Sequence, residues 1–173
     1  MKAIFKFVLC LSLTALAACT AEDVSPLFKG GLGSKPEKIS SQALQGTMNG
    51  VPWSMTRAVG KIQQDGMLLV SISGNGEVIN CNYSMPLKPA VLFSVPMKVA
   101  DYDFDMLRPN NGYAITWVYT DVQAQIHNVV SDMALISITS VSADRMIGGF
   151  SAKFLDPSNP GALNGVFEIT ICR

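Results

Sequence analysis

Apolar and polar residues alternate with a period of two through most of the chain beyond its N-terminal segment. Leu68, Val70 and Ile72, for example, fall on one face of a stretch whose other face carries Ser71 and Ser73. This period is typical of β-strands with one buried face. No stretch there keeps an apolar period of 3.6 residues long enough to predict a helix. The pattern therefore predicts an all-β domain.

Turn residues interrupt this alternation at short intervals. Asn49-Gly50 and Asp65-Gly66 tolerate the positive φ angles that hairpin turns require. Gly74-Asn75-Gly76 and Asn110-Asn111-Gly112 predict further turns. Strands are predicted at 57–62, 67–73, 77–83, 91–95, 101–105, 113–120, 122–127, 133–141, 146–155 and 166–172.

About ten short strands at even spacing predict an antiparallel β-sandwich or a partly closed barrel. Within this domain we expect Val122, Ala124 and Ile126 to point inward and His127 to lie on the outer face. Cys172 falls on the polar face of its strand, so a disulfide there is expected at a sheet end or on the outer face.

The N-terminal segment has a different pattern. Lys2 and Lys6 precede an apolar run at 7–16, which fits a signal peptide and is too short to span a bilayer. The run ends on Leu16-Ala17-Ala18-Cys19, which resembles the lipobox of bacterial lipoproteins. An ordinary secretory cleavage site is the alternative.

The lipobox resemblance implies cleavage before Cys19 and a diacylglycerol on its sulfur. It divides the chain into a signal peptide (1–18), a lipidated cysteine with a flexible tether (19–41) and a β-domain (42–173). Thr20 resembles the residue that follows the cysteine in outer-membrane lipoproteins. The expected location is therefore the bacterial cell envelope, at the outer membrane.

Charge gives little attraction to nucleic acid or anionic membranes. The 173-residue chain carries 13 basic and 13 acidic residues, and removal of 1–18 leaves 155 residues with a net charge of about −2. No nucleic-acid partner is expected. Attachment to the membrane would come from lipid, because two or more acyl chains hold a protein stably.

This interpretation assigns a fate to each of the four cysteines. Cys10 leaves with the signal peptide and Cys19 takes lipid, so Cys81 and Cys172 remain in an oxidising compartment. We predict that they form a disulfide; two free buried thiols are the alternative. Two cysteines and His127 are too few for a closed zinc site, and no cofactor is predicted.

Several segments together are similar to a family of uncharacterised bacterial lipoprotein β-domains. They are the hairpin at 47–53 (TMNGVPW) and the patterns at 136–141 (ISITSV), 147–150 (IGGF) and 164–167 (NGVF). The likeness covers roughly 44–171. Its motifs are turn glycines and core positions, so it implies a fold rather than an activity.

Asp101, Asp103 and Asp105 place three carboxylates on one strand face, where they could bind Ca²⁺. They also match the start of an EF-hand loop. The match fails at Met106, where that loop needs Gly, and at Gly112, where it needs Glu. The alternative is a solvated strand face whose like charges discourage edge pairing.

Tyr113, Trp117 and Tyr119 share one face of a predicted strand and could form a platform on which a sugar stacks. The alternative is that these aromatic rings belong to the core, because Ile115 shares their face.

Catalysis has little support, because His127 is the single histidine and no nucleophile motif surrounds any serine. The first hypothesis is a non-enzymatic, lipid-anchored envelope domain that binds an envelope protein or glycan, or has a structural role. The alternatives are a hydrolase acting on envelope polymers and a calcium- or sugar-dependent adhesin.

Overall fold

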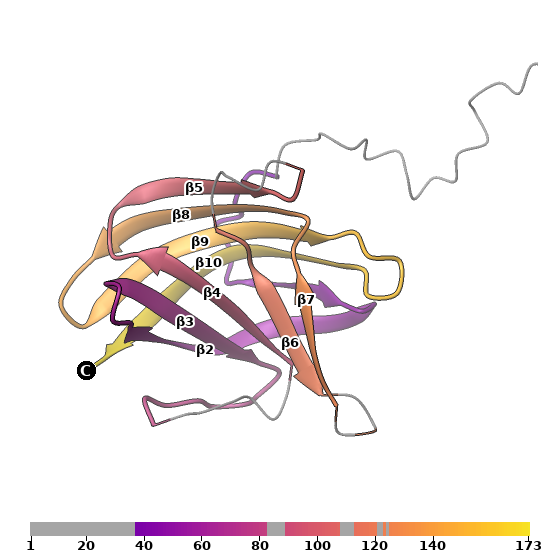
Figure 1. Ribbon diagram of the computed structural model, residues 1–173, viewed down its shortest axis with the longest axis horizontal. Coiled ribbons are helices and arrows are strands. Elements are labelled where there is room, and N and C mark those ends of the chain that lie inside the picture. The colour runs from indigo at the N-terminus through magenta and orange to yellow at the C-terminus, as the bar shows by residue number, and fades with distance from the viewer. Residues whose placement is uncertain (1–36, 83–88, 108–112, 121–122, 124) are drawn as a thin grey trace, which may run out of the picture. The chain divides into compact units, whose positions relative to one another are not determined.

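The computed structural model describes residues 37–82, 89–107, 113–120, 123 and 125–173. This part of the chain contains ten strands and no helix (Figure 1). The strands are β1 (Gln45–Met48), β2 (Val51–Ile62), β3 (Met67–Gly74), β4 (Ala90–Pro96), β5 (Ala100–Asp105), β6 (Thr116–Thr120), β7 (Ile126–Val130), β8 (Met133–Val141), β9 (Arg145–Phe154) and β10 (Gly161–Cys172). All of them belong to one compact unit, Lys35–Arg173.

The ten strands form one sheet in the order β5-β8-β9-β10-β1-β2-β3-β4-β6-β7. Neighbouring strands are antiparallel throughout, and β10 makes an additional parallel pairing with β2 beyond the end of the short β1. β5 and β7 lie at the two ends of the order, so the sheet is not closed. The predicted all-β, antiparallel fold is confirmed.

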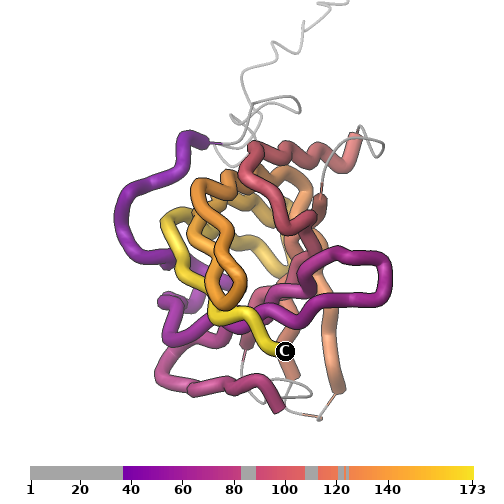
Figure 2. Tube along the Cα trace, turned by 90° about the vertical axis from the view of Figure 1, so that its left-hand side faces the viewer, coloured from indigo at the N-terminus to yellow at the C-terminus, as the bar shows by residue number. Residues whose placement is uncertain are grey.

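The sheet curls until one of its faces packs against itself. Phe93 of β4 lies 5.8 Å, between ring centroids, from both Phe150 of β9 and Phe167 of β10. These strands are far apart in the sheet order, so only a strong curl brings them together (Figures 1 and 2). The rings belong to one continuous apolar cluster to which every strand contributes a buried or partly buried side chain, which for β7 is Val129.

A corner between β7 and β8 connects the two ends of the sheet. β7 pairs with β6, whereas β8 pairs with β5 and β9. At the corner, the fully buried Ser131 donates its N–H to the carbonyl of Ile115 (2.7 Å), and its Oγ accepts the Ile115 N–H (3.0 Å). Asp132 donates its N–H to the carbonyl of Lys153 (2.9 Å). The corner therefore has its backbone polar groups paired where the chain changes partners.

Three of the predicted turns lie in the described residues and have the expected backbone. Asn49 and Gly50 both have positive φ angles (49° and 71°) and join β1 to β2. Gly66 (φ 80°) joins β2 to β3, and Asn75 (φ 53°) follows β3. The predicted turn at 110–112 lies outside the described residues.

Contacts with the sheet begin before residue 42, where the predicted domain starts. Asn164 of β10 accepts the N–H of Ser40 (2.7 Å) and donates its side-chain amide to the carbonyl of Lys38 (3.1 Å). Glu37 forms a salt bridge with Lys153 (2.8 Å). The last residues of the predicted tether therefore dock on β9 and β10.

The strand predicted at 77–83 is wrong for the residues that the structure describes. Residues 77–82 are irregular, and Tyr83 lies outside the description. β3, which precedes them, already has β2 on one edge and β4 on the other. Because no free edge is available there, the alternating pattern of this segment has no strand to pair with.

The predicted faces of β7 are reversed. Ile126 is 54% exposed, whereas His127 and Val129 are half-buried. Side chains alternate along a strand, so an error of one residue exchanges its two faces. The pairing of His127 with Tyr119 of β6 places both side chains on the same face. Val122 and Ala124 of this prediction lie outside the described residues.

Gly165 provides a test of how closely the N-terminal segment packs on β10. Its φ is +145°, and an added Cβ would lie 2.6 Å from the Cα of Leu44 and 2.7 Å from the carbonyl oxygen of Gln42. We expect Gly165→Ala to lower the free energy of unfolding by about 2–3 kcal/mol, measured by urea denaturation.

The matched control is Thr170→Ala, an exposed position on the same strand, for which the change should stay within about 0.5 kcal/mol. Equal unfolding midpoints for the two variants would contradict this packing.

Candidate functional site

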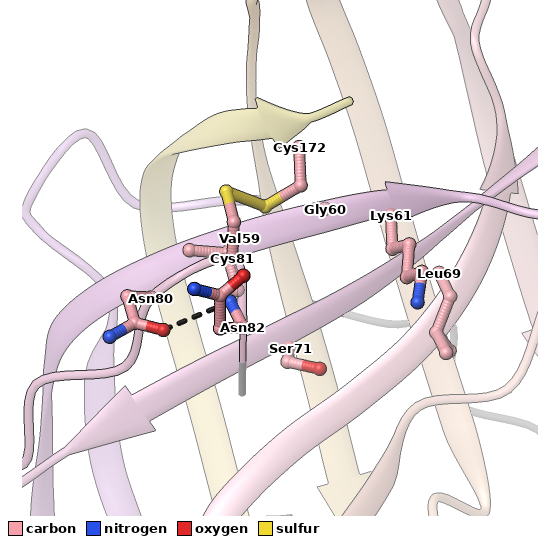
Figure 3. Close-up of a pocket in the computed structure, with 9 residues that line it drawn as sticks. All are labelled: Val59, Gly60, Lys61, Leu69, Ser71, Asn80, Cys81, Asn82 and Cys172. Atoms are coloured by element: carbon pink, nitrogen blue, oxygen red, sulfur yellow. Dashed lines mark hydrogen bonds between the residues drawn. A yellow bond between two sulfur atoms is a disulfide. The ribbon is translucent and has the colours of Figure 1, made fainter. Parts of the chain in front are cut away.

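The predicted disulfide is present. Cys81 and Cys172 are bonded, with their Cα atoms 5.3 Å apart, and the bond attaches the irregular segment after β3 to the end of β10 (Figure 3). Cys172 packs with Val59 and Ile79 in a small apolar cluster separate from the main core. The bond therefore lies at the end of its strand and away from the main core, as the polar neighbours of Cys172 predicted.

A groove of about 550 Å³ lies beside the disulfide. Figure 3 shows Asn80 and Asn82 on one side and Lys61 and Leu69 across from them on the sheet. Asn82 donates its backbone N–H to Oδ1 of Asn80 (2.9 Å), which shapes this rim. Lys61 is the one charged residue in the described lining, and the lining contains no carboxylate.

The three aromatic residues predicted to form a platform do not form one exposed surface in the structure. Trp117 is only 3% exposed and belongs to the core, as the alternative interpretation proposed. The ring of Tyr113 packs edge-on against Tyr102 (5.2 Å between centroids). Burial, and secondly the nearby Tyr113, raise the pKa of Tyr102 above its usual value. Tyr119 remains half-buried at the surface.

Tyr119 stands in the middle of a stack of three rings. Its centroid is 4.7 Å from Trp117 on one side and 4.9 Å from His127, which is nearly parallel to it (14°). Tyr119 and His127 are direct cross-strand partners in β6 and β7, and such aromatic pairs stabilise a sheet. The stack therefore runs from the core at Trp117 to a half-buried position at His127.

A second groove, which we call the Tyr119 groove, opens beside this stack and has a volume of about 330 Å³. Polar side chains from the β7–β8 corner and from the loop after β9 surround it. Its lining consists of Met106, Tyr119, His127, Asn128, Val129, Val130, Asp132, Asp156 and Asn159.

Hydrogen bonds hold the polar residues of the Tyr119 groove in place. Tyr119 donates its hydroxyl to Oδ1 of Asn159 (2.8 Å). Asp132 accepts the N–H of Leu155 through Oδ2 (2.6 Å), and Asp156 accepts the N–H of Ser158 through Oδ1 (2.8 Å). Each carboxylate keeps a second oxygen outside these bonds, so the groove combines aromatic rings with fixed hydrogen-bond acceptors.

Sequence reasoning identified Tyr119 but missed its partners in the groove. His127 was assigned to the opposite face, and Asp132, Asp156 and Asn159 were not singled out. A signal for Asp156 and Asn159 was available, because Asp156-Pro-Ser-Asn is rich in turn residues, which concentrate in loops. Nothing in the sequence indicated that this loop meets β7.

A smaller hollow of about 190 Å³ shares Tyr119 with this groove. We call it the aromatic pocket; its lining is Met48, Asn49, Val51, Pro52, Trp53, Asn75, Pro89, Trp117 and Tyr119. Trp53 donates its indole N–H to the carbonyl of Pro89 (3.1 Å). The indole N–H of Trp117 is buried and has no acceptor among the residues that the structure describes.

The three aspartates of the predicted calcium site lie along β5, at one end of the sheet. Asp101 accepts a hydrogen bond from the hydroxyl of Ser137, and Asp105 accepts the N–H of Leu107 (2.9 Å). Within the described ranges, no three potential metal-binding side chains gather around one point. The structure therefore does not bring the three carboxylates together, and their charge lies on an edge strand, where it opposes pairing with another sheet.

Comparisons with protein-family models, with curated proteins and with solved structures give no match to this chain. Among the residues that the structure describes, no helix has the length and apolar character needed to cross a membrane.

The two tryptophans offer a matched pair of substitutions, since each is 3% exposed. Trp53→Phe removes the donor that is bonded to the carbonyl of Pro89, whereas Trp117→Phe removes a donor that has no acceptor among the described residues. We expect Trp53→Phe to cost about 1–2 kcal/mol more free energy of unfolding than Trp117→Phe. Urea denaturation of both variants measures the difference, and the reverse order would contradict the assigned bonding.

Proposed function

We propose that the protein is a lipid-anchored domain of the bacterial cell envelope that binds a ligand without transforming it. The basic, apolar and lipobox segments that end at Cys19 support the anchor. The disulfide is compatible with an oxidising compartment, where such bonds persist. The residue after the cysteine, Thr20, supports the outer membrane as its location.

The observation that carries the binding role is the Tyr119 groove. Ligand sites are typically hollows of about 300–1,000 Å³ in which a few fixed polar groups accompany aromatic and apolar walls. The Tyr119 groove, at about 330 Å³, has this composition. The partner would be an envelope glycan or protein.

The composition of the groove supports binding rather than catalysis. Its described lining contains no Ser, Thr, Cys or Lys, so a nucleophile there would have to be Asp132, Asp156 or one of the rings of Tyr119 and His127. Asp132 and Asp156 each accept a backbone N–H, which is a structural role.

One observation favours a hydrolase as a second candidate, because His127, Asp132 and Asp156 line the same groove. Paired carboxylates are the usual catalytic groups of enzymes that cleave glycosidic bonds. Release of soluble fragments from purified peptidoglycan, abolished by Asp132→Asn or Asp156→Asn, would select this candidate over the binding role.

The anchor predicts lipid on one sulfur. Cells that express the full-length protein and are fed an alkyne-labelled palmitate should incorporate the label, and Cys19→Ser should abolish the incorporation because the acceptor sulfur is lost. Cys10→Ser provides the matched control and should keep the label. An unlabelled wild-type protein would rule out the anchor.

The binding role predicts contacts at the groove in cells. A photo-crosslinking benzoylphenylalanine in place of the exposed Asn128, in the groove lining, should give a crosslinked adduct detectable by a mobility shift or mass spectrometry. The same residue in place of the exposed Thr170, which is not part of the groove lining, should give none. Identical results at the two positions would contradict a ligand at the groove.

A further inference from the structure

We infer that the ligand of the Tyr119 groove is a neutral saccharide, an assignment that rests on the proposed binding role. The argument combines the charge of the groove, the geometry of its acceptors and the aromatic pocket that adjoins it.

Charge excludes acidic ligands. The described lining of the groove has two carboxylates, Asp132 and Asp156, and contains neither Lys nor Arg. An anionic polymer or a phosphate headgroup brought there would meet like charge with no cation in the lining to balance it. The occupant is therefore not an anion.

The polar groups of the groove suit a ligand with several hydroxyl donors. A carboxylate is an acceptor with two oxygens, and the amide of Asn159 has both an acceptor and a donor end. The N–H groups of Leu155 and Ser158 bond one oxygen of Asp132 and one of Asp156, respectively, which orients both carboxylates. The second oxygen of each carboxylate takes no part in these two bonds. The vicinal hydroxyls of a sugar ring supply several such donors on one ring.

The aromatic pocket gives the saccharide a second place to bind. It shares Tyr119 with the groove, has no charged residue in its described lining, and is walled by Pro52, Trp53 and Trp117. Its volume of about 190 Å³ equals roughly six waters at about 30 Å³ each, which suits one substituent rather than a chain. Trp117 lines this pocket, and its buried indole N–H lacks an acceptor among the described residues; a sugar hydroxyl or acetamido carbonyl is an acceptor of the kind that it lacks.

A peptide fits these observations less well. An extended peptide gains affinity mainly by backbone pairing with a strand edge, and its own N–H groups are spaced along one line. The acceptors here come from separate segments, the β7–β8 corner and the loop after β9. The end strand β7 contributes 127–130 to the lining, but the side-chain acceptors Asp132, Asp156 and Asn159 lie outside that strand.

Isothermal titration calorimetry of the purified full-length protein tests the inference with four probes. Chitohexaose and maltohexaose represent neutral saccharides, hexagalacturonate an acidic one, and a decapeptide of alternating threonine and valine a peptide that can pair with a strand edge. We expect saturable binding of at least one neutral saccharide and none of the other two probes.

Asp156→Asn should weaken that binding about tenfold or more, because it removes the charge that strengthens the bond to a hydroxyl. Its Oδ1 can still accept the Ser158 N–H, so the fold should be kept. Asp144→Asn, in the turn between β8 and β9, is the matched control and should change the Kd less than twofold. Tyr119→Phe, which loses only the bond to Asn159, should also weaken binding.

Binding of the acidic probe or the peptide alone, absence of any binding, or equal affinities for Asp156→Asn and Asp144→Asn would each overturn the saccharide assignment. If the crosslink at Asn128 still formed in cells, the groove would keep its binding role with another ligand. If that crosslink were also absent, the proposed function itself would fail.

Discussion

The rest of the structure depends on the burial of one sheet face against itself. No helix and no second sheet covers it in the part of the chain that the structure describes. The curl that brings Phe93 against Phe150 and Phe167 is therefore what removes the apolar face from water. Each of these rings contributes a large buried area, and their edge-on and tilted contacts restrict how the two halves of the sheet can pack.

This curl also places the candidate site. The chain must pass from one end of the sheet to the other at Ser131 and Asp132, and that corner brings the groove residues of β7 close to the loop after β9. The Tyr119 groove therefore lies where the curled sheet meets its own far end. Asp132 belongs both to the corner and to the groove. Its backbone N–H bonds the carbonyl of Lys153, and its side chain accepts the N–H of Leu155 beside the groove.

A disulfide and a pair of side-chain hydrogen bonds attach irregular segments to the curled sheet, in addition to the contacts of the core. The disulfide holds the segment after β3 against the end of β10, and it covers Val59 with a small cluster of its own. Asn164 binds the chain at Lys38 and Ser40, close to where the predicted tether would end. Both attachments connect residues distant in sequence, so they limit motions that local hairpins alone would allow.

The sequence by itself determined the local structure of this protein. The two-residue period and the turns at Asn49-Gly50 and Asp65-Gly66 are set by neighbouring residues, which is why the strands and hairpins there are confirmed. Only the tertiary structure decided the faces of β7, the absence of a strand at 77–82 and the hydrogen bond between Tyr119 and Asn159. Each depends on which strand edge is free or which loop comes close, and those are properties of the whole curled sheet rather than of any one stretch of sequence.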